Sequence, residues 1–409
     1  LFQIPSKGYS MLSRFIRNAT FNIVADFSNR ISNAIIIILI SKFLTLNEFG
    51  TFNLATSYLT IGTLISFWGY GNLLTREVTN EQHRLGEFFI NFSVMRFIFF
   101  FILLVAIYFI VPKLNYSNET INVILIISLG MFAESVKNLL YSSFNAFEKT
   151  HFVSFIYLVN SIIKLILVYV ILSIGFGIKE VAWITTILSY ITAFLLIIIA
   201  ILKLPSLISK VKWKFCVDQT RLAFPLFLIA LFSIAENRLD ILLLSGFYPE
   251  NIVGLYSSAV VIQSALLIIP DGIRNAMFPI LAKNSLIDQK KIENIYSLII
   301  KFVLIITIGI SVGGIILASN IMLTIYDKKF LESVAIFRIL MVSFPIYSIV
   351  ILNVRLLNAF YKDYSIAKIF AFDLALTIIL NLLITPKLGG IGAASIKLFA
   401  TIILLILSS

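Results

Sequence analysis

The chain has 409 residues, of which 60% are hydrophobic and only 13% charged, and its formal net charge is +12. Soluble domains carry about 25% charged residues, so this composition excludes a soluble protein and predicts a membrane-embedded one. Basic loops on one side of the membrane explain the positive charge better than nucleic-acid binding does. The single Cys216 and the distant His83 and His151 indicate neither a disulfide framework nor a metal site.

Twelve apolar segments are long enough to cross a bilayer, and each is predicted to be a helix because lipid offers the backbone no hydrogen-bond partners. The first six lie at residues 17–43, 52–74, 88–111, 120–144, 151–174 and 181–204. The other six lie at residues 221–245, 252–280, 294–319, 332–354, 362–384 and 389–407. The expected fold class is an all-α polytopic membrane protein with about twelve transmembrane helices in two six-helix bundles.

The placement of lysine and arginine predicts the orientation. If the N-terminus lies inside, the inner loops and flanks hold about 17 of these residues and the outer loops about 6, as the positive-inside rule requires. A missed or additional helix would blur this contrast. We therefore expect both termini on the cytoplasmic side.

The domain organisation follows from the loops. Residues 1–10 precede Met11, which begins a natural-looking start, and they are set aside as a candidate non-native extension. Residues 11–204 form the predicted N-terminal bundle and residues 221–409 the C-terminal bundle. Between them, residues 205–220 include SLISKVKWKF and are predicted to be a basic, amphipathic cytoplasmic linker.

The two halves carry an internal repeat. Residues 37–55 and 241–259 match without a gap at seven identical positions, among them the pairs Asn47/Asn251 and Gly50/Gly254. A second pair of similar stretches lies near the end of each half, GFGIKEVAWI in the first and LGGIGAASIK in the second. Since each half has an even number of helices, both insert with the same orientation, which predicts two bundles with a cavity between them.

The stretches NEFGTFNLA, GYGNLLTRE and GGIGAAS resemble those of polysaccharide flippases of the O-antigen (Wzx) type, in the same superfamily (MOP) as the MATE multidrug exporters. The resemblance implies a MATE-like, V-shaped transporter with a positively charged lumen, not an enzyme. It implies transfer of an undecaprenyl-pyrophosphate-linked oligosaccharide across the bacterial inner membrane by alternating access. Expected partners are this lipid-linked oligosaccharide, membrane lipid and other polysaccharide-assembly membrane proteins, and no nucleic acid.

Ionisable residues inside spans are the candidate functional residues, because each costs roughly 2.5–3.5 kcal/mol at a helix centre and must face water or a partner. In the first span, Asn22, Asp26, Asn29, Arg30 and Asn33 recur every three or four residues and predict a polar lumen wall. Arg30 would meet the anionic head group, and Asp26 would tune it or carry a coupling ion. The alternative is a self-neutralised pair that only packs helices.

The seventh span repeats this pattern. Glu236, Asn237 and Asp240 share one face, and the two carboxylates are candidates for holding Na⁺ or a proton. Arg238 points roughly the other way and is a weaker lumen candidate. The alternative is that one carboxylate lies near the outer interface.

Other charges lie in the fourth, fifth and eleventh spans. Lys164 lies near the middle of the membrane, so it requires an anion, either a substrate phosphate or Glu134. The predicted substrate-binding cations are Arg30, Lys137, Lys164, Arg238 and Lys368. The predicted ion-coupling residues are Asp26, Glu134, Glu236, Asp240 and Asp373, and the predicted polar lumen residues are Asn22, Asn29, Asn33 and Asn237.

The charge balance separates the functional alternatives. Basic groups outnumber acidic ones within the spans, which suits a pyrophosphate cargo better than a cationic drug. The alternative is a multidrug or metabolite/cation antiporter of the same fold. A membrane-embedded glycosyltransferase or polymerase is disfavoured because the loops are too short to supply catalytic residues. No phosphate-binding G-x-x-x-x-G-K-[ST] motif occurs, so ATP hydrolysis by this chain is not expected. Transport would be driven by an ion gradient (H⁺ or Na⁺), by the substrate gradient or by a partner, and no cofactor or metal is expected.

Overall fold

The computed structural model describes residues 28–29, 31–274, 289–359 and 363–408. Throughout these ranges the regular structure is helical, with no strand. The described parts of the predicted spans lie mainly on helices, but the predicted span 52–74 is divided between two helices that end at Phe67 and begin at Tyr70, with Gly69 between them at a φ of 73°. Within the described ranges, eight helices are long and apolar enough to cross a membrane on their own. The all-α polytopic fold class is therefore confirmed.

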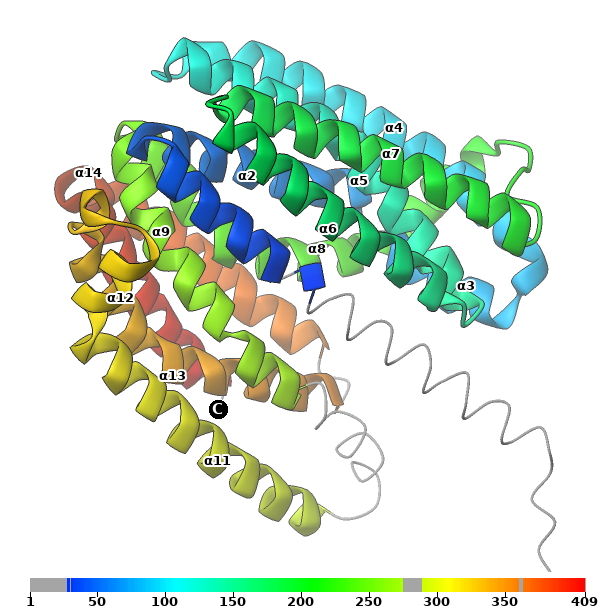
Figure 1. The fold of residues 1–409 in the computed structure, drawn as a ribbon. Coiled ribbons are helices and arrows are strands. Elements are labelled where there is room, and N and C mark those ends of the chain that lie inside the picture. The colour runs from blue at the N-terminus through cyan, green and yellow to red at the C-terminus, as the bar shows by residue number, and fades with distance from the viewer. Residues whose placement is uncertain (1–27, 30, 275–288, 360–362, 409) are drawn as a thin grey trace, which may run out of the picture. The chain divides into compact units, whose positions relative to one another are not determined.

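The helices of the first half run in chain order with short connections (Figure 1). They are Ile31–Phe43, α2 (Leu46–Phe67), α3 (Tyr70–Asn80), α4 (Leu85–Ile110), α5 (Asn118–Ala146), α6 (Thr150–Ser173) and α7 (Ile178–Lys203). The helices of the second half are α8 (Trp213–Ser245), α9 (Glu250–Leu266), α11 (Gln289–Ile316), α12 (Ala318–Ile325), α13 (Ser333–Ala359) and α14 (Asp363–Ser408).

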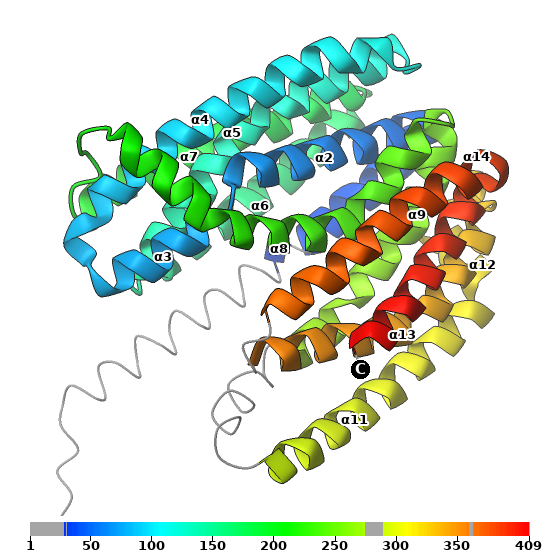
Figure 2. The same cartoon turned by 180° about the vertical axis from the view of Figure 1, so that it is seen from behind.

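Helix α14 contains the last two predicted spans. Its regular backbone is interrupted at Gly389, where φ is 55° and ψ is −137°. Positive φ is readily adopted only by glycine, so the predicted turn before the final span is a sharp break within one long helix. Figure 2 shows both arms of α14 in orange and red.

The chain forms two compact units. Unit 1 comprises residues 1–43 and 58–231, and unit 2 comprises residues 44–57 and 232–409. Helices α2 and α8 therefore each contribute to both units, a feature that a division by chain position alone does not describe. Helix α8 also begins at Trp213, inside the segment predicted as a linker.

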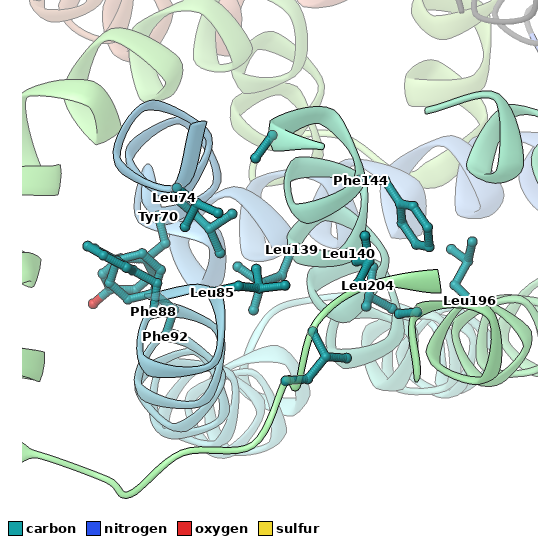
Figure 3. Close-up of a cluster of buried hydrophobic side chains, with 14 of the residues drawn as sticks. Tyr70, Leu74, Leu85, Phe88, Phe92, Leu139, Leu140, Phe144, Leu196 and Leu204 are labelled. Carbon is teal, nitrogen blue, oxygen red and sulfur yellow. The ribbon is translucent and has the colours of Figure 1, made fainter. Parts of the chain in front are cut away.

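Unit 1 has a large apolar core between α3, α4, α5 and α7 (Figure 3). Its fully buried members include Phe88 and Phe92 of α4, Leu140 and Phe144 of α5 and Leu196 of α7. These residues lie toward the end of the bundle where α4 begins and α7 ends. The core therefore fixes this end of unit 1 and, with it, the connection into α8.

In unit 2, the first turns of α2 cross α9 at two glycines. A methyl group at Gly50 would lie 1.8 Å from the Glu250 carbonyl oxygen, and one at Gly254 would lie 2.7 Å from the Leu46 carbonyl oxygen. Gly50 and Gly254 are matched positions of the repeat, and so are Leu46 and Glu250. The contacts at the crossing are therefore reciprocal: Gly50 faces Glu250, and the matched Gly254 faces the matched Leu46. A duplicated sequence is expected to give such a pair of contacts.

Candidate functional site

A polar cluster lies inside unit 1 between α5 and α7. The Lys137 ammonium Nζ is 2.5 Å from Glu134 Oε1, one helical turn earlier on the same face of α5. The Ser189 hydroxyl on α7 donates to the same oxygen at 2.8 Å. Lys137 is only 6% exposed, so Lys137 and Glu134 neutralise each other's charge inside the unit rather than at its surface.

Lys164 of α6 adds a second ammonium to this cluster. It is half-buried, it acts electrostatically on Glu134, and it forms no hydrogen bond or ion pair with another described residue. One turn earlier on α6, Asn160 accepts a hydrogen bond of 2.9 Å from the Thr192 hydroxyl. The described cluster therefore holds two ammonium groups against one carboxylate.

A second cluster lies inside unit 2, with the opposite balance. Asp240 Oδ2 of α8 accepts a 3.0 Å hydrogen bond from the Tyr256 hydroxyl of α9 and lies 3.6 Å from Lys397 Nζ of α14. Asp373, also on α14, is electrostatically coupled to both Asp240 and Lys397. Both aspartates are 3% exposed, and Asp373 Oδ1 has no hydrogen-bond partner in the described chain. The cluster holds two carboxylates against one ammonium.

The structure describes only part of the predicted lumen wall. Asn22, Asp26 and Arg30 lie outside the described residues, and so do the side chains of Glu236 and Asn237 in α8. Asn29 accepts a hydrogen bond from the Ser161 hydroxyl of α6, which connects the first span to unit 1. Asn33 is exposed.

The remaining predicted cations differ in their surroundings. Arg238 is half-buried in α8 without an ion-pair partner among the described residues, and Lys368 is exposed on the first arm of α14. Glu134 forms its ion pair with Lys137 and also interacts electrostatically with Lys164.

Sequence reasoning missed the direct partners of these groups. Lys397 is a charged residue inside a span, but nothing in the sequence links it to Asp240, which lies 157 positions earlier. Tyr256 and Ser189 resemble ordinary packing residues until the fold brings them to a carboxylate. Only the intramembrane position of Lys397 and Asp240 could have signalled that each requires a partner.

The sequence also matches a known family. A family model described as polysaccharide biosynthesis protein matches residues 39–335, well over half of the chain. The chain belongs to this polysaccharide biosynthesis family. No curated protein sequence is similar enough to count as a relative.

Solved structures show the same fold. The lipid II flippase MurJ, in an inward closed conformation, superposes with a TM-score of 0.79 at 19% identity, covering 95% of this chain and 86% of that one. An inward-facing multidrug resistance MATE family transporter of the MOP superfamily gives 0.74 at 15% identity, covering 93% of each chain. A MOP superfamily transporter from Pyrococcus furiosus Vc1 gives 0.69 at 12% identity, covering 97% and 93%. This polysaccharide biosynthesis protein thus has the MOP transporter fold and is a multi-pass membrane protein.

Proposed function

We propose that this protein moves a polyprenyl-pyrophosphate-linked oligosaccharide, such as an O-antigen repeat unit, across the bacterial inner membrane by alternating access. Family membership supports the polysaccharide pathway, and the transporter fold supports movement of a molecule rather than chemistry on it. Both termini would lie on the cytoplasmic side, with other polysaccharide-assembly membrane proteins as candidate partners.

The proposal of an anionic substrate rests on the positive charge of the unit 1 cluster. Lys164 is an intramembrane ammonium without an ion pair or hydrogen bond to the described residues, and a second ammonium, Lys137, lies in the same cluster. The substrate pyrophosphate would supply the missing negative charge at Lys164. The polyprenyl tail would remain in the bilayer while the sugars cross through a wet interior.

We also propose that the unit 2 cluster couples transport to an H⁺ or Na⁺ gradient. Asp240 and Asp373 place two carboxylates beside one ammonium, and a bound cation or proton would neutralise the second carboxylate. The two units would then have different tasks, with the anionic substrate at the unit 1 cluster and the cation at the unit 2 cluster.

Lys164→Gln tests the role of the unit 1 cation. Purified protein in liposomes is given a fluorescent polyprenyl-pyrophosphate oligosaccharide, and an outside quencher reports how fast inner-leaflet label becomes accessible. Loss of one hydrogen bond to a charged group, worth about 1.5–3 kcal/mol, should slow flipping by about 10- to 150-fold, while Lys164→Arg retains most of the rate. Lys113→Gln, at the far end of α4, is the matched control. Flipping by Lys164→Gln at the wild-type rate would refute the role of this lysine.

A cation or drug antiporter is the second candidate, and the excess of carboxylates in unit 2 favours it. Export of cationic dyes by proteoliposomes, abolished in Asp373→Asn, would support this function. Oligosaccharide flipping without dye export would exclude it.

A further inference from the structure

The connection between α7 and α8 is fixed to the body of unit 1. The Lys212 backbone N–H donates to Asn91 Oδ1 at 2.7 Å, and Lys212 Nζ lies 2.8 Å from Glu87 Oε1. A methyl group at Gly86 would lie 2.8 Å from the Ser206 carbonyl oxygen. Residues 206–212 therefore lie against the first turns of α4, the end at which α4 enters the predicted membrane span.

The first turns of α8 are held equally firmly on one face. Cys216 and Ala223 are fully buried, and the Thr220 hydroxyl lies 2.7 Å from the Tyr70 hydroxyl. The Phe227 ring stacks on Trp68 with centroids 4.2 Å apart. These contacts determine which face of α8 is left uncovered.

The uncovered face carries large apolar side chains. Trp213 is 61% exposed and Ile208 83% exposed. Val211, Val217 and Phe224 are also exposed, and Phe224 touches the Trp68 ring as well, with centroids 5.9 Å apart; Leu222 is exposed on the opposite side of the helix. At 100° per residue, Trp213, Val217 and Phe224 lie within about 40° of one another on the helix. An apolar stripe of this kind marks contact with a membrane or a partner.

Basic side chains accompany this stripe. Lys210, Lys214 and Arg221 are exposed, and Asp218 is the one acidic residue between positions 208 and 224. On the helical wheel, Lys214 and Arg221 lie beside the apolar stripe. Exposed tryptophan next to lysine and arginine at the end of the spans is the pattern of an interfacial surface.

We propose that residues 208–224 form a docking surface for anionic phospholipids of the adjoining leaflet. Trp213 and Phe224 insert at the level of the head groups, and Lys210, Lys214 and Arg221 bind the lipid phosphates. Each basic residue near an anionic surface should enrich such lipids about fivefold. The surface would hold unit 1 at a fixed depth in the membrane, whatever substrate the protein carries.

Trp213 provides a direct test, because the chain has three tryptophans, Trp68, Trp183 and Trp213. In the Trp68→Phe/Trp183→Phe protein, Trp213 is the sole tryptophan, and phenylalanine at position 68 keeps an aromatic ring beside Phe227 but loses the hydrogen bond from the indole to the Thr220 carbonyl oxygen. The protein is placed in nanodiscs of mixed phosphatidylcholine and phosphatidylglycerol, with brominated acyl chains on one lipid at a time. We expect brominated phosphatidylglycerol to quench Trp213 fluorescence several-fold more than brominated phosphatidylcholine at the same mole fraction.

Two charge variants show which basic residues cause the preference for phosphatidylglycerol. Lys210→Gln/Lys214→Gln/Arg221→Gln should remove the preference for phosphatidylglycerol but keep quenching by both lipids. Neutralising the exposed lysines at the other end of unit 1, with Lys42→Gln/Lys113→Gln/Lys179→Gln, should leave the preference intact. Thermal unfolding checks that each variant is folded.

Equal quenching by the two lipids in the parent protein would refute the anionic preference. Absence of quenching would show that the surface faces water or another protein. Loss of the preference in both variants would assign it to net charge rather than to this surface. Because no transport is measured, these outcomes are independent of the flippase proposal.

Discussion

The crossing of α2 and α9 should tolerate no side chain at Gly50. The structure predicts that Gly50→Ala lowers stability and that Gly254→Ala does so less. A methyl group at Gly50 would lie 1.8 Å from the Glu250 carbonyl oxygen and 2.9 Å from the Gly254 nitrogen. At Gly254 the closest backbone approaches are 2.7 Å to the Leu46 oxygen and 3.3 Å to the Gly50 nitrogen.

The geometry sets the magnitude. Ordinary carbon contacts lie at about 3.5–4.0 Å, so Gly50→Ala requires the two backbones to separate by well over an ångström. The obstructing atoms belong to helical backbone and cannot rotate away as a side chain would. Overpacking typically costs about 1–3 kcal/mol, and we expect Gly50→Ala at the upper end of this range or beyond it and Gly254→Ala within it.

Thermal unfolding of the purified protein measures this effect as an apparent Tm. The matched control is Gly309→Ala on α11, where an added methyl group would meet nothing within 4 Å. Alanine has the higher helix propensity, so the control should leave the apparent Tm unchanged or raise it slightly. An apparent Tm for Gly50→Ala equal to that of the control would refute the close crossing.

Two further predictions concern buried charges. Lys397→Met leaves the buried Asp240 and Asp373 without their ammonium and should cost about 3–5 kcal/mol, whereas Asp240→Asn leaves Asp373 beside Lys397 and should cost less, as measured by apparent Tm. Arg96 is 2% exposed, donates to the Ser135 carbonyl and lies 4.6 Å from the centre of the Phe67 ring, while its Nε and Nη2 have no partner among the described residues. Arg96→Met should therefore match or exceed the wild-type apparent Tm, and a clear decrease would show that the guanidinium stabilises unit 1.

Much of the fold could be predicted because its determinants are local. Apolar stretches of about 20 residues specify helices in lipid whatever their neighbours are. The repeat matched Gly50 with Gly254, and the backbone crossing explains why both positions are glycine. Other elements escaped prediction, since the passage of α2 and α8 between the two units depends on packing that no local pattern encodes.

The candidate sites were harder to predict for the same reason. Glu134 and Lys137 meet on one face of α5 because residues three apart on a helix are neighbours. Spacing could not show that Lys137 would be the ion-pair partner of Glu134 while Lys164 forms none with the described residues. It also could not join Asp240 to Lys397, since their contact depends on how α8 and α14 pack within unit 2.

The repeat shows how a duplicated scaffold carries different sites in its two halves. At the offset of 204, Asp240 and Tyr256 correspond to Ile36 and Phe52, and the matched ends of the second pair of similar stretches pair Lys397 with Ile184. Asp240, Tyr256 and Lys397 thus have apolar counterparts in the first half. Ile36 and Phe52 are themselves buried, so these positions accept an apolar core without loss of the helix. The glycines of the crossing are identical in both halves because backbone contact admits no alternative, whereas the buried polar group occurs once. We therefore propose that this carboxylate, phenol and ammonium, placed together at positions that an apolar core can fill, serve a function of unit 2 rather than its stability.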